Sequence, residues 1–271
     1  MTADLCGELR RVSTLAEMIA PMVEAPSVWS AKPVGWRDVA DDVMGLARKR
    51  VLEALLPAGP RPVGERLARF YDRDGDYAGA TFAALSPNPP NDLTAVDLHA
   101  VSMLSVSVGP RATRRLLDDG PSRNDVLEAL EAVPVMDLHV AGPEVLEAMG
   151  HLYTTVKGYL SAPTTAHPNR WVTASKICAR KRPALFPVRD RVVCGYLGLL
   201  DLGSWQADYQ VFRSLLGDPE VQQAVDAAAD AADASAGDRR LRIDTERLRI
   251  LDAALWTYPS RRDDDEQGSE E

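Results

Sequence analysis

The most informative stretch for predicting the fold is residues 171–198, WVTASKICARKRPALFPVRDRVVCGYLG. A segment with helical spacing runs up to Lys181, and Pro183 and Pro187 then interrupt it. Proline ends a helix and restricts the residue before it to extended conformations. The stretch therefore predicts a helix that ends near Lys181, a short fixed connection, and a second helix that begins near Val188.

The same pattern of helices separated by proline and glycine extends in both directions from this stretch. We expect helices that begin at a capping box at Thr14, at about Trp36 (to Leu56), at Thr94 (ending before Gly109-Pro110), at Ser122, at Pro143, at Trp205 (to Leu216), at Pro219 with Asp218 as N-cap (to Ala234), and at about Arg239 (to Tyr258). Residues 133–140 have the pattern of a short strand, but no partner strand is visible. The sequence therefore predicts an all-α, multi-helix globular bundle.

One proline-rich and glycine-rich segment, residues 57–64 (PAGPRPVG), is the best candidate for a domain boundary. It divides an N-terminal helical extension, residues 1–60, from a main helical domain, residues 61–258. Residues 259–271 follow as an acidic tail. Because the last nine residues hold six acids and no apolar side chain, we expect this tail to be disordered.

The overall composition is that of an ordinary globular protein. The chain has 271 residues, of which 45% are hydrophobic and 26% charged. Three cysteines far apart do not suggest a disulfide framework. The sequence has no apolar run approaching the roughly 20 residues of a membrane helix, and the N-terminus has no apolar signal core. We therefore expect a cytoplasmic protein that is not embedded in a membrane.

Charge is distributed unevenly along the chain. The net charge is −9, and six of the negative charges lie in the last nine residues. By contrast, seven basic side chains between residues 170 and 191 surround a single acid, Asp190. Such a local inversion of sign is typical of a site that meets an anion. Asp190 is expected in the first turn of its helix, where the helix dipole favours an ionised carboxylate.

Several common kinds of site are not predicted. Glycine-rich phosphate loops and the nucleophile elbow of hydrolases are missing. The segment Asp72-Arg-Asp74-Gly-Asp76 begins like a calcium loop, but Tyr77 and Ala83 occupy the positions that need glycine and glutamate. The four histidines lack metal-ligand spacing, and Asp226, Asp230 and Asp233 are interpreted as a solvated helix face. No metal and no cofactor is therefore expected.

Three segments carry a resemblance to a known family. They are residues 91–102 (NDLTAVDLHAVS), the pattern S-K-x-x-x-R-K-R-P-x-L-x-P-V-x-D-x-V-V that starts at Ser175, and residues 248–256 (LRILDAALW). Together they resemble a bacterial domain-of-unknown-function family, family 6308, over roughly residues 65–258. That resemblance implies no activity.

A more distant resemblance involves residues 185–198 (LFPVRDRVVCGYLG). They are similar to the segment of helix-hairpin-helix DNA glycosylases in which a catalytic aspartate precedes a helix. The resemblance implies a DNA-glycosylase-like core in which Asp190 stabilises or attacks the sugar and Lys176 is the amine nucleophile. The chain departs from that family in lacking the glycine-rich hairpin before Lys176 and a C-terminal cysteine cluster.

The sequence leaves three hypotheses open. The first is a nucleic-acid or nucleotide binding protein in which Asp190 and Lys176 are catalytic and the remaining basic residues contact phosphates: Arg180, Lys181, Arg182, Arg189 and Arg191. The ligand is then a nucleic acid or a phosphorylated small molecule. The second is a non-catalytic protein–protein interaction module with a basic groove. In the third, Lys176, Arg182 and Asp190 form a structural network with Asp252 and Trp256. Whether the protein is an enzyme stays open.

Overall fold

The computed structural model describes residues 31–161 and 170–267, with side chains up to Pro259. Within these residues the chain forms α-helices and two short 3-10 helices, and its only β-structure is an isolated bridge between Asp72 and Leu241. The helices are α1 (Asp41–Ala54), α2 (Val63–Phe70), α3 (Gly79–Phe82), α4 (Ala95–Ser102), α5 (Pro110–Leu117), α6 (Pro121–Glu131), η2 (Leu138–Val140), α7 (Pro143–Leu160), α8 (Arg170–Lys181), α9 (Arg191–Leu197), η3 (Leu200–Leu202), α10 (Trp205–Gly217), α11 (Pro219–Ala234) and α12 (Arg247–Gln267). The predicted all-α bundle is confirmed, and the residues considered for a strand contain η2 instead.

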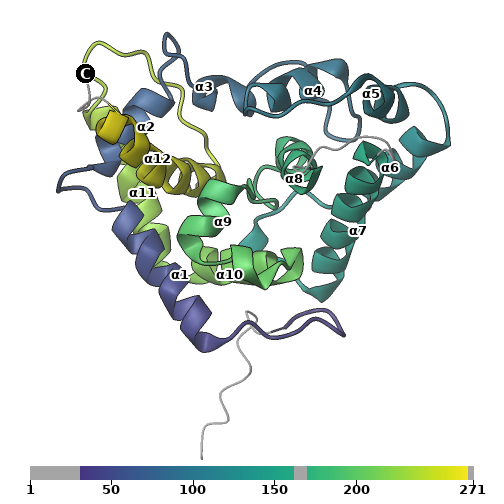
Figure 1. Ribbon diagram of the computed structural model, residues 1–271, viewed down its shortest axis with the longest axis horizontal. Coiled ribbons are helices and arrows are strands. Elements are labelled where there is room, and N and C mark those ends of the chain that lie inside the picture. The colour runs from purple at the N-terminus through teal and green to yellow at the C-terminus, as the bar shows by residue number, and fades with distance from the viewer. Residues whose placement is uncertain (1–30, 162–169, 268–271) are drawn as a thin grey trace, which may run out of the picture.

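Helix α8 lies in the middle of the bundle. In Figure 1, α3, α4 and α5 cross one side of it, α6 and α7 flank it, and α9 and α10 lie on the opposite side from α4. Every residue of α8 from Val172 to Lys181 is buried. A helix buried all round is normally apolar, so the basic side chains of α8 need partners inside the protein.

Several helix ends follow the expected signals. Thr94 forms a capping box with Asp97 at the start of α4, Asp218 caps α11, and Pro143 lies in the first turn of α7. Each of these residues satisfies or removes a backbone N–H that has no partner within its helix. Helices α8, α10 and α11 end within one residue of the expected positions. The helix expected at Thr14 lies outside the described residues.

Other helix ends differ from the prediction. Helix α4 ends at Ser102, and Gly109-Pro110 starts α5 instead of ending the helix before it. Proline is favoured in the first turn of a helix, where its missing N–H has no intrahelical role. Helix α9 begins at Arg191 rather than Val188, because Asp190 is extended and caps it. The last helix begins at Arg247, eight residues later than the expected position.

The described part of the N-terminal extension packs on the main body. Ala47, Val51 and Ala54 of α1 are fully buried and belong to the same hydrophobic core as α9, α11 and α12. The hydrophobic core therefore continues across the boundary suggested at residues 57–64. The assignment of residues 1–60 and 61–258 to separate domains stays a prediction. Helix α12 continues to Gln267, into the range expected to be a disordered tail, and residues 268–271 lie outside the described range.

None of the helices described here combines the length and the apolar character that a membrane span requires.

Candidate functional site

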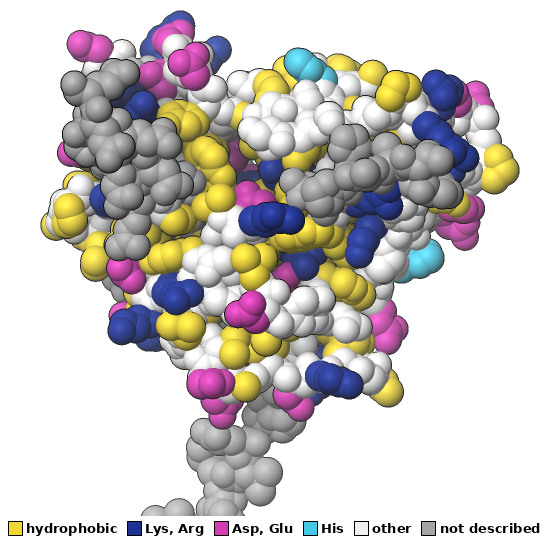
Figure 2. All heavy atoms as spheres, viewed as in Figure 1, with side chains coloured by type: hydrophobic (Ala, Val, Ile, Leu, Met, Phe, Trp, Pro, Cys, Tyr) yellow, Lys and Arg dark blue, Asp and Glu magenta, His cyan; other side chains and the backbone are white. Residues whose placement is uncertain are grey.

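A pocket of about 460 Å³ opens beside α8. It lies among α8, the start of α9, one face of α12, the segment that leads into α3, and the loop after α4. On the face drawn in Figure 2, hydrophobic side chains border a hollow in this region, and acidic and basic side chains are visible within it. The polar residues that line the pocket are Asp76, Ser105, Lys176, Asp190, Arg191, Asp244, Arg249 and Asp252.

The connection between α8 and α9 is fixed from two sides, which positions Asp190 at the pocket. The Ser175 hydroxyl donates to the Pro187 carbonyl at 2.9 Å and accepts from the Arg189 N–H at 2.9 Å. From the other side, Asp252 Oδ2 accepts from the Val188 N–H at 2.9 Å. The two prolines predicted this rigid connection, and these bonds hold it against both α8 and α12.

Asp190 is a helix cap whose carboxyl also faces the pocket. Its Oδ1 accepts a hydrogen bond from the Val193 N–H at 2.8 Å, and 8% of the residue is exposed. Burial raises the pKa of this carboxyl, while the Val193 N–H and the Lys176 ammonium act in the opposite direction. No guanidinium forms an ion pair with Asp190 among the described residues. The carboxyl is thus held in place but keeps a side toward the pocket.

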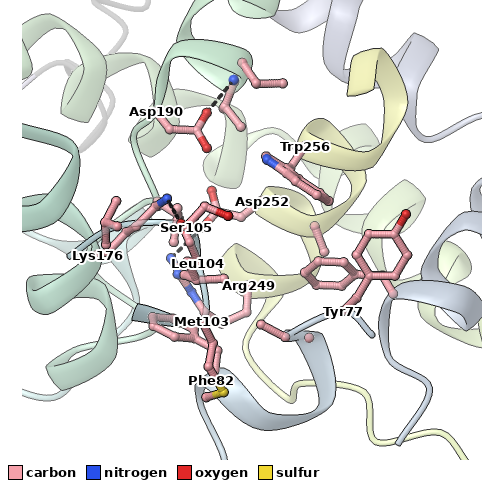
Figure 3. Close-up of a pocket in the computed structure, with 18 of the residues that line it drawn as sticks. Tyr77, Phe82, Met103, Leu104, Ser105, Lys176, Asp190, Arg249, Asp252 and Trp256 are labelled. Atoms are coloured by element: carbon pink, nitrogen blue, oxygen red, sulfur yellow. Dashed lines mark hydrogen bonds and ion pairs between the residues drawn. The ribbon is translucent and has the colours of Figure 1, made fainter. Parts of the chain in front are cut away.

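Lys176 enters the same pocket from α8. Its Nζ donates to the Leu104 carbonyl at 2.6 Å (Figure 3). Burial lowers the pKa of this amine, and the Asp190 carboxylate opposes that shift. The neighbouring Ser105 has φ of 58°, an uncommon conformation for a residue other than glycine. This turn directs the loop after α4 across the pocket, next to the amine.

Two further carboxyls lie deeper, on and before α12. Asp252 Oδ2 forms an ion pair with Arg249 at 2.6 Å, and Asp252 Oδ1 is buried without a hydrogen-bond partner in the described structure. Burial raises the pKa of Asp252 to about 6, and the Asp190 charge contributes to the same shift. Burial also raises the pKa of Asp244 to about 6, although it accepts a hydrogen bond from the Tyr71 hydroxyl at 3.2 Å.

One wall of the pocket is aromatic. Phe70 lies with its ring centroid 6.0 Å from that of Tyr77 and 5.8 Å from that of Trp256, and the Tyr77 and Trp256 centroids are 6.0 Å apart. Phe82 and Met103 add apolar surface nearby. An apolar pocket with a few convergent polar groups is the usual form of a small-ligand site.

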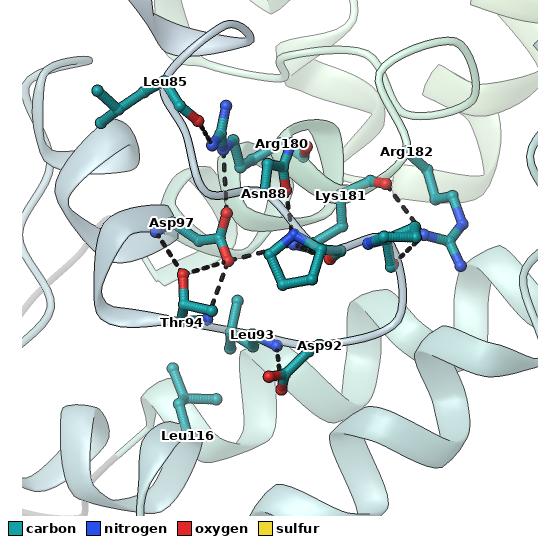
Figure 4. A network of polar contacts seen from close by, with 12 residues as sticks. Leu85, Asn88, Asp92, Leu93, Thr94, Asp97, Leu116, Arg180, Lys181 and Arg182 are labelled. Carbon is teal, nitrogen blue, oxygen red and sulfur yellow. Dashed lines mark hydrogen bonds and ion pairs between the residues drawn. The ribbon is translucent and has the colours of Figure 1, made fainter.

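The basic residues at the end of α8 do not reach this pocket. Arg180 and Lys181 share the buried carboxylate of Asp97, with Nε–Oδ1 and Nζ–Oδ2 distances of 3.1 Å each (Figure 4). Arg180 also donates to the carbonyls of Phe82 and Ala83 at 2.6 and 2.7 Å. These two cations therefore tie α8 to α4 and to the segment before it.

Arg182 and Arg189 are also bound internally. Arg182 donates to the backbone carbonyls of Leu130, Val133 and Pro90 at 2.6 to 2.8 Å. Arg189 donates from Nε to Asp208 Oδ2 at 2.6 Å, and both residues line a second pocket that does not include Asp190. Arg189 also lies against the rings of Tyr153, Trp171 and Tyr209. Of the five residues predicted to contact phosphates, Arg191 alone has an exposed side chain.

The structure thus brings together Asp190, Lys176 and Arg191 and separates them from the other four cations. The suggested structural network is realised differently: Asp252 joins α12 to the connection through Val188, while Arg182 lies elsewhere. Sequence reasoning missed Asp97 as an ion-pair partner, since its capping motif explained it fully. It also missed Phe70 and Tyr77, which line the pocket but lie about 100 residues before Lys176 in the sequence. No group of residues suited to a metal ion occurs in the described ranges.

Comparison with known proteins finds one related family. A family model described as a family of unknown function, DUF6308, matches residues 63–259. No curated protein and no solved structure gives a significant match. The matched range includes the whole pocket, so the site described above belongs to the part of the chain that the family model covers.

Proposed function

Because the chain belongs to DUF6308, a family of unknown function, its activity has to be argued from the pocket, and we propose that it binds a nucleoside or nucleotide and cleaves its N-glycosidic bond. One observation carries this proposal. Asp190 and Lys176, a carboxyl and an amine from different helices, line the same pocket beside an aromatic wall.

The aromatic wall supports binding of a nucleobase. A flat heterocycle stacks on aromatic side chains, and such stacking contributes about 1–3 kcal/mol per base. Phe70, Tyr77 and Trp256 supply that surface. The volume of about 460 Å³ falls in the range of small-ligand pockets, roughly 300–1,000 Å³.

The carboxyl and the amine support chemistry at the sugar. When the C1′–N bond breaks, its electron pair leaves with the base and positive charge develops on the sugar ring. The Asp190 carboxylate stabilises this charge. Water then adds to C1′ and gives a proton to Asp190, and that proton is passed through solvent to the departing base. The products are the neutral base and the sugar or, from a nucleotide, the sugar phosphate. Because burial favours the neutral amine of Lys176, that amine can attack C1′ in place of water, so that the base leaves with the proton that the amine loses. The sugar ring of the adduct then opens to an imine, which water hydrolyses.

A single nucleotide fits better than a long nucleic acid. Affinity for a polyanion grows with the number of phosphates that are neutralised. Four of the five predicted phosphate contacts are buried and bound to internal groups. Arg191 lines the pocket and is exposed, which supports a contact with a single phosphate.

Base release tests the chemistry. The purified full chain is incubated with nucleosides and nucleoside monophosphates, and free base is measured by chromatography. Asp190→Asn is the most informative variant, because asparagine caps a helix as well as aspartate does but carries no charge. We expect it to keep its thermal stability and to lose about 100-fold or more of the activity.

Borohydride trapping tests the amine. We expect reduction to attach the sugar to Lys176 in the unmodified protein and not in Lys176→Met. Since only the neutral amine attacks, trapping should increase as the pH rises toward the lowered pKa of Lys176. Arg191→Met is the control for the phosphate contact and should weaken binding of the monophosphate but not of the nucleoside. If no nucleoside binds, or if Asp190→Asn releases base at the full rate, the proposal fails.

The alternative of a protein-interaction module with a basic groove has less support. It needs several cations on one accessible surface, whereas Arg180, Lys181, Arg182 and Arg189 are each exposed by 6% or less.

A further inference from the structure

We propose that Asp252 selects the ligand by accepting a hydrogen bond from an N–H group on the base, so that the pocket prefers bases with an amino group facing Asp252. This inference rests on the proposed function, and it adds the chemical class of the base. Nothing in the sequence hypotheses gave Asp252 a role in binding.

The two oxygens of Asp252 have different surroundings. Oδ2 accepts from the Val188 N–H at 2.9 Å and pairs with Arg249 at 2.6 Å. Oδ1 has no hydrogen-bond partner among the described residues, although it is buried and the residue is only 6% exposed. In Figure 3 the carboxyl points into the pocket, between Lys176 and Trp256.

The neighbouring donors are already used. Lys176 Nζ donates to the Leu104 carbonyl, and Arg249 forms an ion pair with Asp252 Oδ2 and donates to the carbonyls of Pro183 and Phe186. A buried acceptor without a donor is unfavourable, and a ligand that supplies the donor removes this penalty. A ligand that presents another acceptor at this position recovers nothing and is repelled by the carboxylate. Oδ1 therefore favours ligands with an N–H group.

The position of Asp252 on α12 determines which part of the ligand it meets. Trp256 follows it by one helical turn, so both side chains lie on the same face. A base stacked against Trp256 has its edge toward the Asp252 carboxyl. The amino and imino groups of nucleobases lie on that edge, and the sugar is then left for Asp190 and Lys176.

Two ligands that differ in one group test this inference. Adenosine has a 6-amino group, and purine riboside has hydrogen at the same position. Dissociation constants are measured for both by calorimetry with the full chain. We expect adenosine to bind roughly tenfold more tightly, the ratio that corresponds to one satisfied buried acceptor. This comparison uses the unmodified protein and does not depend on the folding of any variant.

Two variants assign the preference to a residue. In Asp252→Asn the amide can accept from Val188 N–H and turn its NH₂ toward the ligand, so the ratio of dissociation constants should fall to about one or below. Asp244→Asn is the matched control, because Asp244 lines the same pocket but accepts from Tyr71. Its ratio should stay at the value of the unmodified protein.

Each outcome has a distinct meaning. If neither ligand binds, the proposed function fails. If both bind equally, the function stands and the selection by Asp252 is wrong. If adenosine is preferred and Asp252→Asn keeps that preference, another residue recognises the amino group and the inference is overturned.

Discussion

At the scale of single residues, basic side chains that are adjacent in sequence have different roles. The sequence pointed to Asp190 as one acid among cations and to Lys176 through the resemblance to DNA glycosylases, and both residues line the pocket. The partners of Arg180 and Lys181 could not be identified from the sequence. Asp97 lies more than 80 residues earlier, and its sequence signal is that of a helix cap. A local sequence pattern shows that a charged side chain is present, but tertiary packing determines which group it pairs with.

The buried cluster of Asp97, Arg180 and Lys181 leads to a prediction about stability. Arg180→Met leaves Asp97 paired with Lys181 alone, and it leaves the buried carbonyls of Phe82 and Ala83 without a donor. A buried polar group that loses its partner costs about 1–3 kcal/mol, so Arg180→Met should lower the free energy of unfolding by at least that order. Urea titration followed by circular dichroism measures the change.

The control is the same substitution at an exposed arginine. Arg191→Met removes a charge of the same sign from the surface, where single substitutions usually change stability by less than about 0.5 kcal/mol. If Arg180→Met is as stable as Arg191→Met, Arg180 does not have the structural role assigned to it, and a role in ligand contact becomes the better interpretation.

At the scale of helices, capping and proline signals predicted where most helices are, but not always which end they mark. Asp218 and Pro143 were assigned correctly because both favour the start of a helix. Gly109-Pro110 was ambiguous, since glycine commonly ends a helix and proline commonly begins one. Asp190 shows the same limit: it is the cap of α9, so the helix starts after it and its carboxyl faces the pocket. Which of two compatible conformations forms depends on packing.

A close approach between α2 and α11 gives a prediction at this scale. A Cβ at Gly64 would lie 2.5 Å from the Ala231 carbonyl oxygen and 2.8 Å from Ser235 Oγ. A methyl group at that distance from the backbone forces the helices apart, and overpacking of this kind costs about 1–3 kcal/mol. Gly64→Ala should accordingly lower the midpoint of urea unfolding.

Gly45→Ala provides a control with the opposite sign. Gly45 is exposed in α1, and no atom lies within 4 Å of a Cβ built there. Alanine in an exposed helix interior is more stable than glycine by roughly 0.5–1 kcal/mol. The unfolding midpoint should rise for Gly45→Ala and fall for Gly64→Ala. Equal shifts in the same direction would contradict the packing seen between α2 and α11.

At the scale of the whole molecule, the core does not stop where the family match begins. The match starts at residue 63, and the sequence suggested a boundary at the same place. Yet α1 contacts α9, α10, α11 and α12, and Arg48 Nε lies 2.6 Å from Asp218 Oδ2 at the start of α11. Trp36, just before α1, packs edge to face on Trp205 with centroids 5.2 Å apart. A proline-rich segment marks a break in secondary structure, which need not be a break in the core.

This continuity predicts that a chain consisting of residues 61–271 does not fold stably. Deleting residues 1–60 exposes the surface that Trp36, Val51 and Leu55 cover, and each such side chain contributes roughly 1.5–3 kcal/mol to stability when it is buried. Since whole domains are stable by only about 5–15 kcal/mol, the loss is a large part of the total. Thermal melts followed by circular dichroism should show a much lower or non-cooperative transition for the truncated chain.

Two substitutions in the full chain separate packing from chain length. Val51→Asp places a charge in the core face of α1, whereas Lys49→Asp places the same side chain on its exposed face. A buried charge without a partner is strongly unfavourable, so Val51→Asp should reproduce much of the destabilisation and Lys49→Asp very little. If residues 61–271 instead melt cooperatively at the temperature of the full chain, α1 is an appendage, and the separate N-terminal extension that the sequence suggested is the correct description.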